Sequence, residues 1–211
     1  MGLRRATGVW TKAGALGLVL AVSAPTPGAP IAPRSSNESG LAGKLLVAGP
    51  RMVDPRFSRT VIYMVQHDAN GAMGLIVNRP FKEASIASLL EQLGMEHKGV
   101  SGALRMHYGG PVGAGTVFVL HTADYRGART KVVRDGIALT GSPDVLRAIG
   151  SGVGPRRALL LLSYSGWAPG QLEQEIHAGA WVVVPPDLAL IFDDDYETKW
   201  ERALARRDVD L

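Results

Sequence analysis

The sequence predicts an α+β or mixed α/β domain, and three observations support this fold class. Short segments rich in β-branched and aromatic residues outnumber the helical ones. Two of these segments are joined by an Asn70-Gly71 turn, and such a hairpin argues against a purely parallel sheet. About four segments with helical signals are scattered among the strands. We therefore expect α+β, with a mixed, largely antiparallel sheet.

The first strands have the clearest signals. "KLLVAGP" (44–50) is predicted to be a strand that ends in a Gly-Pro turn. "TVIYMVQ" (60–66) and "AMGLIVN" (72–78) are predicted to pair as a hairpin, because Asn-Gly accepts the positive φ that a tight turn demands. Further strands are expected at 116–122, 136–141, 158–164, 180–185 and 188–192.

Helices are expected from apolar spacing and from start signals. The segment 84–95 has one apolar helical face, formed by Ile86, Leu89, Leu90 and Leu93. Ser142 as N-cap, Pro143 at the first helical position and Asp144 in the first turn predict a helix that runs to about Ile149. The other two helices are expected after Pro169 and over 196–205.

Length, charge and composition limit the function classes. One domain accounts for 211 residues, and the absence of cysteine excludes disulfides, thiolate nucleophiles and cysteine-ligated metals. The net charge of +4 depends on Arg4, Arg5 and Lys12, because the remaining chain has 20 basic and 19 acidic residues. This near-neutral balance disfavours a nucleic-acid partner.

The N-terminus resembles an export signal. Residues 1–24 combine a basic start with the short apolar run "AGALGLVLAVSA" and a small-residue cleavage triplet, Val22-Ser23-Ala24. The run is shorter than the roughly 20 residues that span a bilayer, so no transmembrane span is expected in the mature chain. We predict export to the periplasm, a flexible linker at 25–42 and a single domain over 43–211. The alternatives are an uncleaved anchor or a start codon assigned too early.

Two motifs that resemble catalytic loops fail on spacing. "YGGPVGAGTVF" is followed by a predicted strand rather than the helix of a dinucleotide-binding loop and lacks the Lys-Ser/Thr of a P-loop, so its glycines are assigned to turn geometry. "SYSGW" has Ser163 and Trp167 where a serine nucleophile elbow requires glycine.

The stretch "SYSGWAPGQLEQEI" (163–176) is partly explained by helix initiation. Pro169 suits a first helical turn, and Glu173 after Gly170 has the spacing of half a capping box. Trp167 is predicted on the loop before this helix, where it either closes the core or lines a pocket.

Histidines and acids have structural explanations beside catalytic ones. Asp68 at the hairpin is expected to shape the turn, and Glu173 with His177 is expected to be a surface pair on one helix face. His107 and His121 would approach each other if their strands pair. The run Asp193–Asp195 is expected to cap the following helix, with a divalent-cation site as the alternative.

Together these segments resemble the AlgH/YqgE family of bacterial proteins. The matching stretches are "DPRF" (54–57), "HDANGAMGLIVNRP" (67–80), "YGGPV" (108–112), "GWAPGQLEQEI" (166–176), "AWVVVP" (180–185), "IFD" (191–193) and Trp200, with Gly49-Pro50 and Met52. The resemblance implies a branched sheet that curls into a pseudo-barrel. It implies no reaction, because the family has no established activity; one member's role in alginate regulation suggests a transcriptional regulator.

The chain departs from the family pattern at four positions. Ser163, Ser165 and Ala168 stand where the family usually has Gly, Ala and Gly, and Gly179 replaces an Asn before the "AW" dipeptide. Members are generally intracellular and begin near the first strand, which makes the cytoplasm the alternative location.

The main hypothesis is a non-enzymatic binding or regulatory module for an unknown small molecule or protein, without cofactor or metal. Arg79 is expected to take an anion and Trp167 an apolar or planar group. The predicted ligand site comprises His67, Asp68, Asn78, Arg79, Trp167, Gly170, Gln171 and Glu173. The alternatives are a hydrolase-like or metal-assisted enzyme that uses His67, Asp68, Glu173 and His177, and a transcriptional regulator.

Overall fold

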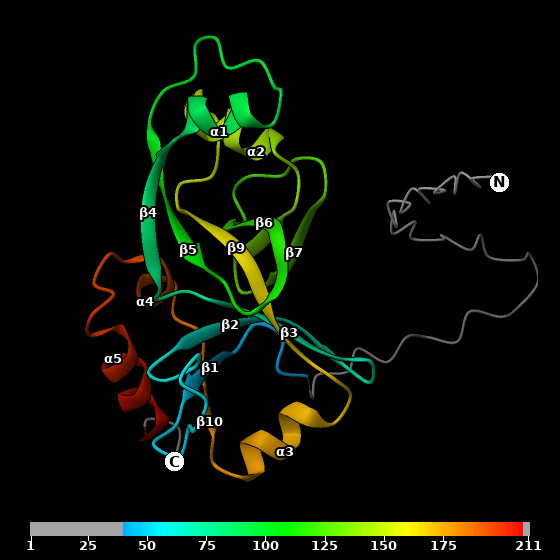
Figure 1. Cartoon of the computed structure of the whole chain (residues 1–211), viewed down its shortest axis with the longest axis vertical. Helices are drawn as coiled ribbons and strands as arrows, with labels where there is room; N and C mark the ends of the chain where they lie inside the picture. Colours follow the sequence, from blue (N-terminus) through cyan, green and yellow to red (C-terminus); the bar gives the residue numbers. More distant parts are fainter. Residues whose placement is uncertain (1–39, 209–211) are drawn as a thin grey trace, which may run out of the picture. The chain divides into compact units, whose positions relative to one another are not determined.

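A computed structural model of the chain describes residues 40–208, and these belong to one compact unit (Figure 1). The expected signal segment (1–24) and the expected linker up to residue 39 lie outside the described residues. Leu41, at the end of that expected linker, packs against the core. In residues 40–208, no helix has the length and apolar character needed to cross a membrane.

Ten strands form one curled and branched sheet, which confirms the predicted α+β class. They are β1 (Leu45–Ala48), β2 (Val61–Asp68), β3 (Gly71–Ile76), β4 (Pro80–Ser85), β5 (Ala103–Tyr108), β6 (Val112–Thr122), β7 (Thr130–Arg134), β8 (Ile137–Thr140), β9 (Ala158–Trp167) and β10 (Trp181–Val184). The main path runs β10-β1-β2-β3-β9-β6-β8-β7, and β4 joins through β5. All pairings are antiparallel except that of β5 with β9.

The sheet branches at β9. Its first half pairs with β5 and β6, and its last residues pair with β3, through Ala72↔Trp167 and Gly74↔Ser165. Between the two halves, Ser163 has a φ of 66°, in the left-handed region that non-glycine residues rarely adopt. This bend turns the strand from one branch to the other.

Within residues 40–208, five α-helices and a short 3₁₀ helix flank the sheet. They are α1 (Ile86–Gln92), α2 (Asp144–Gly150), α3 (Gln171–His177), α4 (Leu188–Phe192), α5 (Lys199–Ala205) and η1 (Arg206–Asp208). Figure 1 shows α1 beside α2 at one end of the sheet and α3 at the other, with α4 and α5 along one flank.

Strands β1 and β2 are buried on both faces, and their alternation separates two cores. Residues such as Leu45, Val47 and Tyr63 enter one cluster, whereas Leu46 and Ile62 enter the other. A third cluster lies under α1 and α2. The predicted hairpin is confirmed, since β2 and β3 pair up to Asp68↔Gly71.

Several predicted elements were wrong in type or extent. The segment 188–192 is helix α4 rather than a strand, because the Asp187 side chain accepts from the backbone N–H groups of Ala189 and Leu190. A five-residue apolar run does not distinguish the two by periodicity. Strands β4, β5 and β7 were not expected, because they are half exposed and lack an apolar run.

Helix starts also differ from the prediction. Helix α2 has Pro143 rather than Ser142 as its N-cap; the Ser142 hydroxyl donates to the Asp144 carboxylate at 2.8 Å and accepts from the Asp144 backbone N–H at 3.5 Å. Helix α3 begins at Gln171, so Pro169 lies before the first turn, and Gly170 is the N-cap with a φ of 75°.

The Asp193–Asp195 run mainly pairs with two basic side chains. Asp195 accepts from the Thr198 backbone N–H just before α5, as a capping acid would. The Asp193 carboxylate pairs with Arg202 at 2.7 Å and with the buried Lys199 at 3.2 Å. Burial acts to raise the pKa of Asp193, but Arg202 and Lys199 together hold it below the usual value. The Asp193 carboxylate is thus paired with basic side chains of the protein itself.

Candidate functional site

Trp167 ends strand β9 and is not on a loop, which corrects the sequence prediction. It pairs with Ala72 in β3, next to the hairpin glycine Gly71. A Cβ on Gly71 would lie 2.3 Å from the Trp167 carbonyl oxygen, so this approach requires glycine. Trp167 is 6% exposed and belongs to a core cluster, so it closes the core and also borders a pocket.

Glu175 on α3 connects the aromatic residues of this region. Its Oε2 accepts from the Trp167 indole N–H at 2.9 Å and from the Trp181 indole N–H at 2.7 Å. Its Oε1 accepts from Gln171 Nε2 at 2.9 Å. No lysine or arginine of the described chain forms an ion pair with this carboxylate. Its negative charge is therefore held by neutral donors alone.

Three aromatic rings pack together beside Glu175. Phe57 stacks on Trp167 with 6.5 Å between ring centroids and meets Trp181 edge-on at 5.4 Å. The two indoles are 5.9 Å apart and nearly perpendicular. These offset and edge-to-face arrangements are the favourable ones for aromatic pairs.

These residues border a pocket of about 390 Å³, which we call the Trp167 pocket. Its lining combines apolar side chains with a few polar ones: Met52, Val53, Asp54, Arg56, Phe57, Pro111, Val112, Gly166, Trp167, Gln171, Glu175 and Ala180. Arg56 pairs with Asp54 at 2.7 Å, and this bond lowers the pKa of the Asp54 carboxyl. Because Arg56 neutralises Asp54, Glu175 provides the unpaired negative charge of the lining.

His67 and Glu173 form a separate pair. The Leu41 backbone N–H donates to His67 Nδ1 at 3.0 Å, so the other ring nitrogen carries the proton. That Nε2–H donates to Glu173 at 2.7 Å. The α3 backbone N–H of Glu173 and this histidine together lower the pKa of Glu173. Glu173 therefore neither reaches back as a capping box nor pairs with His177.

The remaining predicted residues serve turns and loops. Asp68 accepts from the Asn70 backbone N–H at 2.7 Å, which confirms its role in the turn. Asn78 accepts from the Val61 N–H and donates to the Arg59 carbonyl, and Arg79 donates to the Ser58 carbonyl at 2.9 Å. Asn78 and Arg79 thus fasten the loop before β2.

Of the eight predicted site residues, the structure brings Trp167 and Gln171 into one pocket, and Gly170 positions them by starting α3. Sequence reasoning missed Glu175, together with Trp181 and the Asp54–Phe57 segment. The family-typical stretches "DPRF", "GQLEQEI" and "AWVVVP" contain all of these residues, so the motifs themselves were the available signal.

The glycine-rich stretch was assigned to turn geometry, and in the structure two of its glycines allow a close approach of two backbones. A Cβ on Gly109 or Gly110 would lie within 2.4 Å of backbone atoms of residues 163–165. His107 and His121 do not meet, because β9 lies between their strands. In the described part of the chain, no three His, Asp or Glu side chains are grouped to hold a metal ion.

The curled, branched sheet with its flanking helices places this chain in the class of small α+β half-barrel proteins. Residues 45–211 match the AlgH-like family model, and the chain belongs to this family. A UPF0301 protein of Rhodospirillum rubrum is 44% identical over 82% of this chain and 91% of its own length. A second UPF0301 protein, from Methylococcus capsulatus, is 44% identical over 81% of this chain and 93% of its own.

Solved structures agree with this assignment. The solution structure of the AlgH protein from Pseudomonas aeruginosa is 38% identical and has a TM-score of 0.68, over 82% of this chain and 92% of that one. A crystal structure of a Corynebacterium diphtheriae protein shares the fold at a TM-score of 0.62 and 21% identity, over 78% of this chain and 86% of its own. The family is one of uncharacterised function.

Proposed function

We propose that this protein is a non-enzymatic binding module and that the Trp167 pocket is its ligand site. The observation that carries the proposal is the Glu175 carboxylate, which borders the pocket with three N–H donors and no cation. A carboxylate has about four acceptor positions, so one remains for a ligand. The expected ligand combines an ammonium or guanidinium group with a planar apolar body that packs beside Trp167 and Phe57.

The lining supports binding rather than nucleophilic catalysis. Among the described residues that border the pocket there is no Ser, Thr, Cys, His, Lys or Tyr. Its two carboxylates are both engaged, Asp54 by Arg56 and Glu175 by the indoles. A group held in this way is suited to fix a ligand's orientation.

The test uses phenethylamine as the cationic aromatic probe and phenylacetate as its charge-reversed counterpart. Binding is followed by intrinsic tryptophan fluorescence and by NMR shift perturbation. Glu175→Gln should weaken phenethylamine binding about tenfold or more, since a hydrogen bond to a charged group contributes roughly 1.5–3 kcal/mol.

Glu173→Gln is the matched control. Glu173 lies on the same helix as Glu175 and pairs with His67, but it does not line the pocket. This variant should bind phenethylamine like the wild type. Equal binding of phenylacetate, or unchanged binding by Glu175→Gln at an unchanged melting temperature, would reject the proposal.

We also propose that the N-terminal segment exports the protein to the periplasm. The support is the order of basic, apolar and small residues within residues 1–24. Intact-mass measurement of the protein from its native host tests this. Loss of the first 24 residues supports export, and a full-length chain rejects cleavage of a signal.

A further inference from the structure

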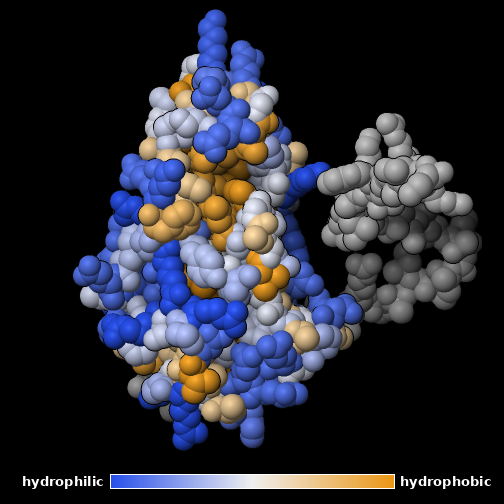
Figure 2. Space-filling view, in the orientation of Figure 1, coloured by the Kyte–Doolittle hydropathy of each residue, from blue (hydrophilic) through white to orange (hydrophobic). Residues whose placement is uncertain are grey.

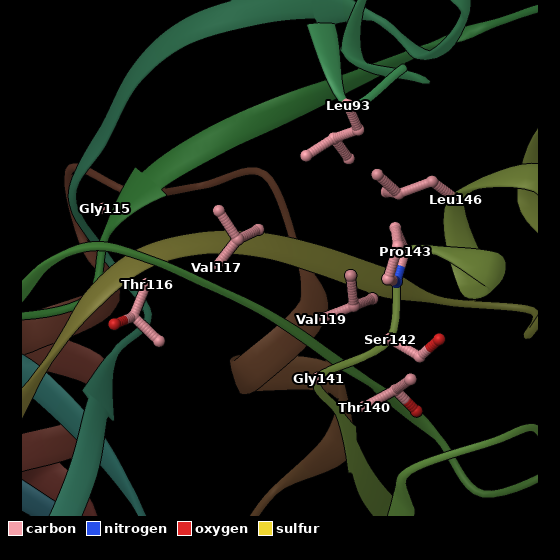
Figure 3. Close-up of a pocket in the computed structure, with 10 residues that line it drawn as sticks. All are labelled: Leu93, Gly115, Thr116, Val117, Val119, Thr140, Gly141, Ser142, Pro143 and Leu146. Carbon is pink, nitrogen blue, oxygen red and sulfur yellow. The ribbon is translucent and has the colours of Figure 1, made fainter. Parts of the chain in front are cut away.

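A second pocket lies further along β6, beside α1 and α2, and has a different character. It has a volume of about 280 Å³ and is bordered by Leu93, Gly115, Thr116, Val117, Val119, Thr140, Gly141, Ser142, Pro143 and Leu146. Figure 3 shows the side chains of Leu93, Val117, Val119 and Leu146 converging on one space, whereas the hydroxyl groups of Thr116, Thr140 and Ser142 point away from it. We call this the aliphatic pocket.

The aliphatic pocket opens on the surface. Leu93 at the end of α1 is 55% exposed, and Val117 in β6 is 43% exposed. Figure 2 shows a hydrophobic area on this face, below the end that carries α1 and α2. No charged residue borders the pocket, so its chemistry is that of an uncharged aliphatic group.

Strand β6 has a free edge at the mouth of this pocket. Thr122 donates its backbone N–H to Arg157 beside β9, and Ala123 donates to Gly136 on the β8 side. Because antiparallel strands alternate these directions, odd-numbered residues of β6 point their N–H and C=O groups toward β8. Strand β8 ends at Thr140, which pairs with Val119. Val117 therefore directs its backbone groups to an edge where no strand of residues 40–208 is paired.

This edge lacks the protection that the other edges of the sheet have. Edge strands are normally blocked by charges, proline or a covering element. Strand β4 carries Pro80 and Lys82, β7 carries Lys131, and β10 packs against α5. The segment "VGAGTV" (112–117) has no charge and no proline, and its residues 114–117 are exposed. The positive φ of Gly113 and Gly115 limits the straight edge to residues from 116 onward.

We propose that this site binds an extended, uncharged peptide segment of a partner protein by strand addition to β6 at Val117. The peptide's main chain bonds the free N–H and C=O of Val117, and one aliphatic side chain enters the aliphatic pocket. Main-chain bonds with a side-chain pocket beside them are the usual basis of strand-addition recognition. A pocket of about 280 Å³ is near the lower limit for small-molecule sites, which suits one side chain.

The probe is the uncharged heptapeptide acetyl-Gln-Thr-Thr-Leu-Thr-Thr-Gln-amide, compared with versions that carry Ala or Glu at the centre. NMR titration of the full chain should shift signals of residues 116–118 and of the pocket. The Ala version should bind at least about tenfold more weakly, because three fewer carbons are buried at roughly 0.8 kcal/mol each. The Glu version should not bind at millimolar concentration.

Variants with matched controls locate the site. Val117→Lys places a charge at the edge and should abolish binding, whereas Val132→Lys, on β7 at a similar exposure of 41%, should not. Leu93→Asp should also abolish binding, and Leu188→Asp should leave it unchanged. Glu175→Gln should retain binding, which separates this site from the Trp167 pocket.

Three results would overturn the proposal. These are equal binding of the Leu and Ala peptides, NMR shifts that fall outside residues 116–118 and the pocket, and normal peptide binding by Val117→Lys. Self-association of the wild-type chain that Val117→Lys abolishes would make a second copy the occupant, and it would also reject the foreign peptide.

Discussion

The Trp167 pocket and the aliphatic pocket lie along the same strand but are built in different ways. Val112 at the start of β6 borders the first, and Gly115, Thr116, Val117 and Val119 border the second. In the Trp167 pocket, directional bonds to Glu175 fix two indole rings. In the aliphatic pocket, only packing places the side chains, and the space exists because β8 ends at Thr140. The polar site thus depends on particular side chains, whereas the apolar site depends on where the neighbouring strand ends.

The largest effect is expected at Trp167. Trp167→Ala should lower the free energy of unfolding by about 3–5 kcal/mol, because it removes a large buried ring and the donor to Glu175. Trp167→Phe keeps a ring and should cost clearly less. Urea denaturation measures both. If the alanine variant were as stable as the wild type, the pocket wall would not depend on this indole.

Lowering the pH should destabilise the fold through two buried histidines, one in β5 and one in β6. Burial lowers the pKa of His107 from 6.5 to about 4, and burial also lowers the pKa of His121, which bonds Thr140 in the aliphatic pocket wall. The unfolded chain therefore binds the proton first as pH falls. Stability is fully present above pH 6.5 and should fall by about 3 kcal/mol from His107 alone as pH approaches 4.

Urea denaturation at several pH values between 7 and 4 measures this slope. His107→Phe should flatten it, and the matched change at the exposed His97 should not. Carboxylates with lowered pKa values, such as Asp54, Asp124 and Glu173, lose their contribution below about pH 5 in wild type and variant alike, so the difference between the two proteins isolates the histidine. An unchanged slope in His107→Phe would mean that this histidine is not buried neutral.

The aliphatic pocket should tolerate loss of a wall residue better than the Trp167 pocket. Leu146→Ala should cost about 2 kcal/mol, the low end for a buried leucine, because the side chain already borders an open space. Leu93→Ala at the exposed mouth should cost under about 0.5 kcal/mol. If both variants cost the same, the pocket would be closed rather than open at Leu93.

Much of the fold could be predicted from the sequence because the strong signals were local. The β2–β3 hairpin followed from Asn70-Gly71, and the strands with continuous apolar runs were found near their observed places. Strands β4 and β5 could not be found, since they are held by pairing with each other and with β9 rather than by their own apolar pattern. Helix α4 was missed because a side-chain cap decided it.

The site was harder to predict than the fold because it depends on tertiary contacts. Trp167 and Gln171 were identified as special residues, but the residue that connects them, Glu175, looked like an ordinary helix-surface glutamate. Arg79 looked like an anion site and instead holds a loop carbonyl. The free edge at Val117 could not be seen at all, since it follows from the length of a different strand.

The smallest effect concerns the bend in β9 that separates the two branches of the sheet. Ser163 has a left-handed φ of 66°, in a region that glycine adopts without steric cost. The strain of about 1–2 kcal/mol exceeds the extra freedom of glycine in the unfolded chain, about 0.5–1 kcal/mol, so Ser163→Gly should stabilise by about 0.5–1 kcal/mol. Ser165→Ala should be nearly neutral, because the Gly109 carbonyl keeps its bond from the Ile76 N–H. Paired urea denaturation of the two variants measures this difference, and destabilisation by Ser163→Gly would mean that the serine side chain itself supports the bend.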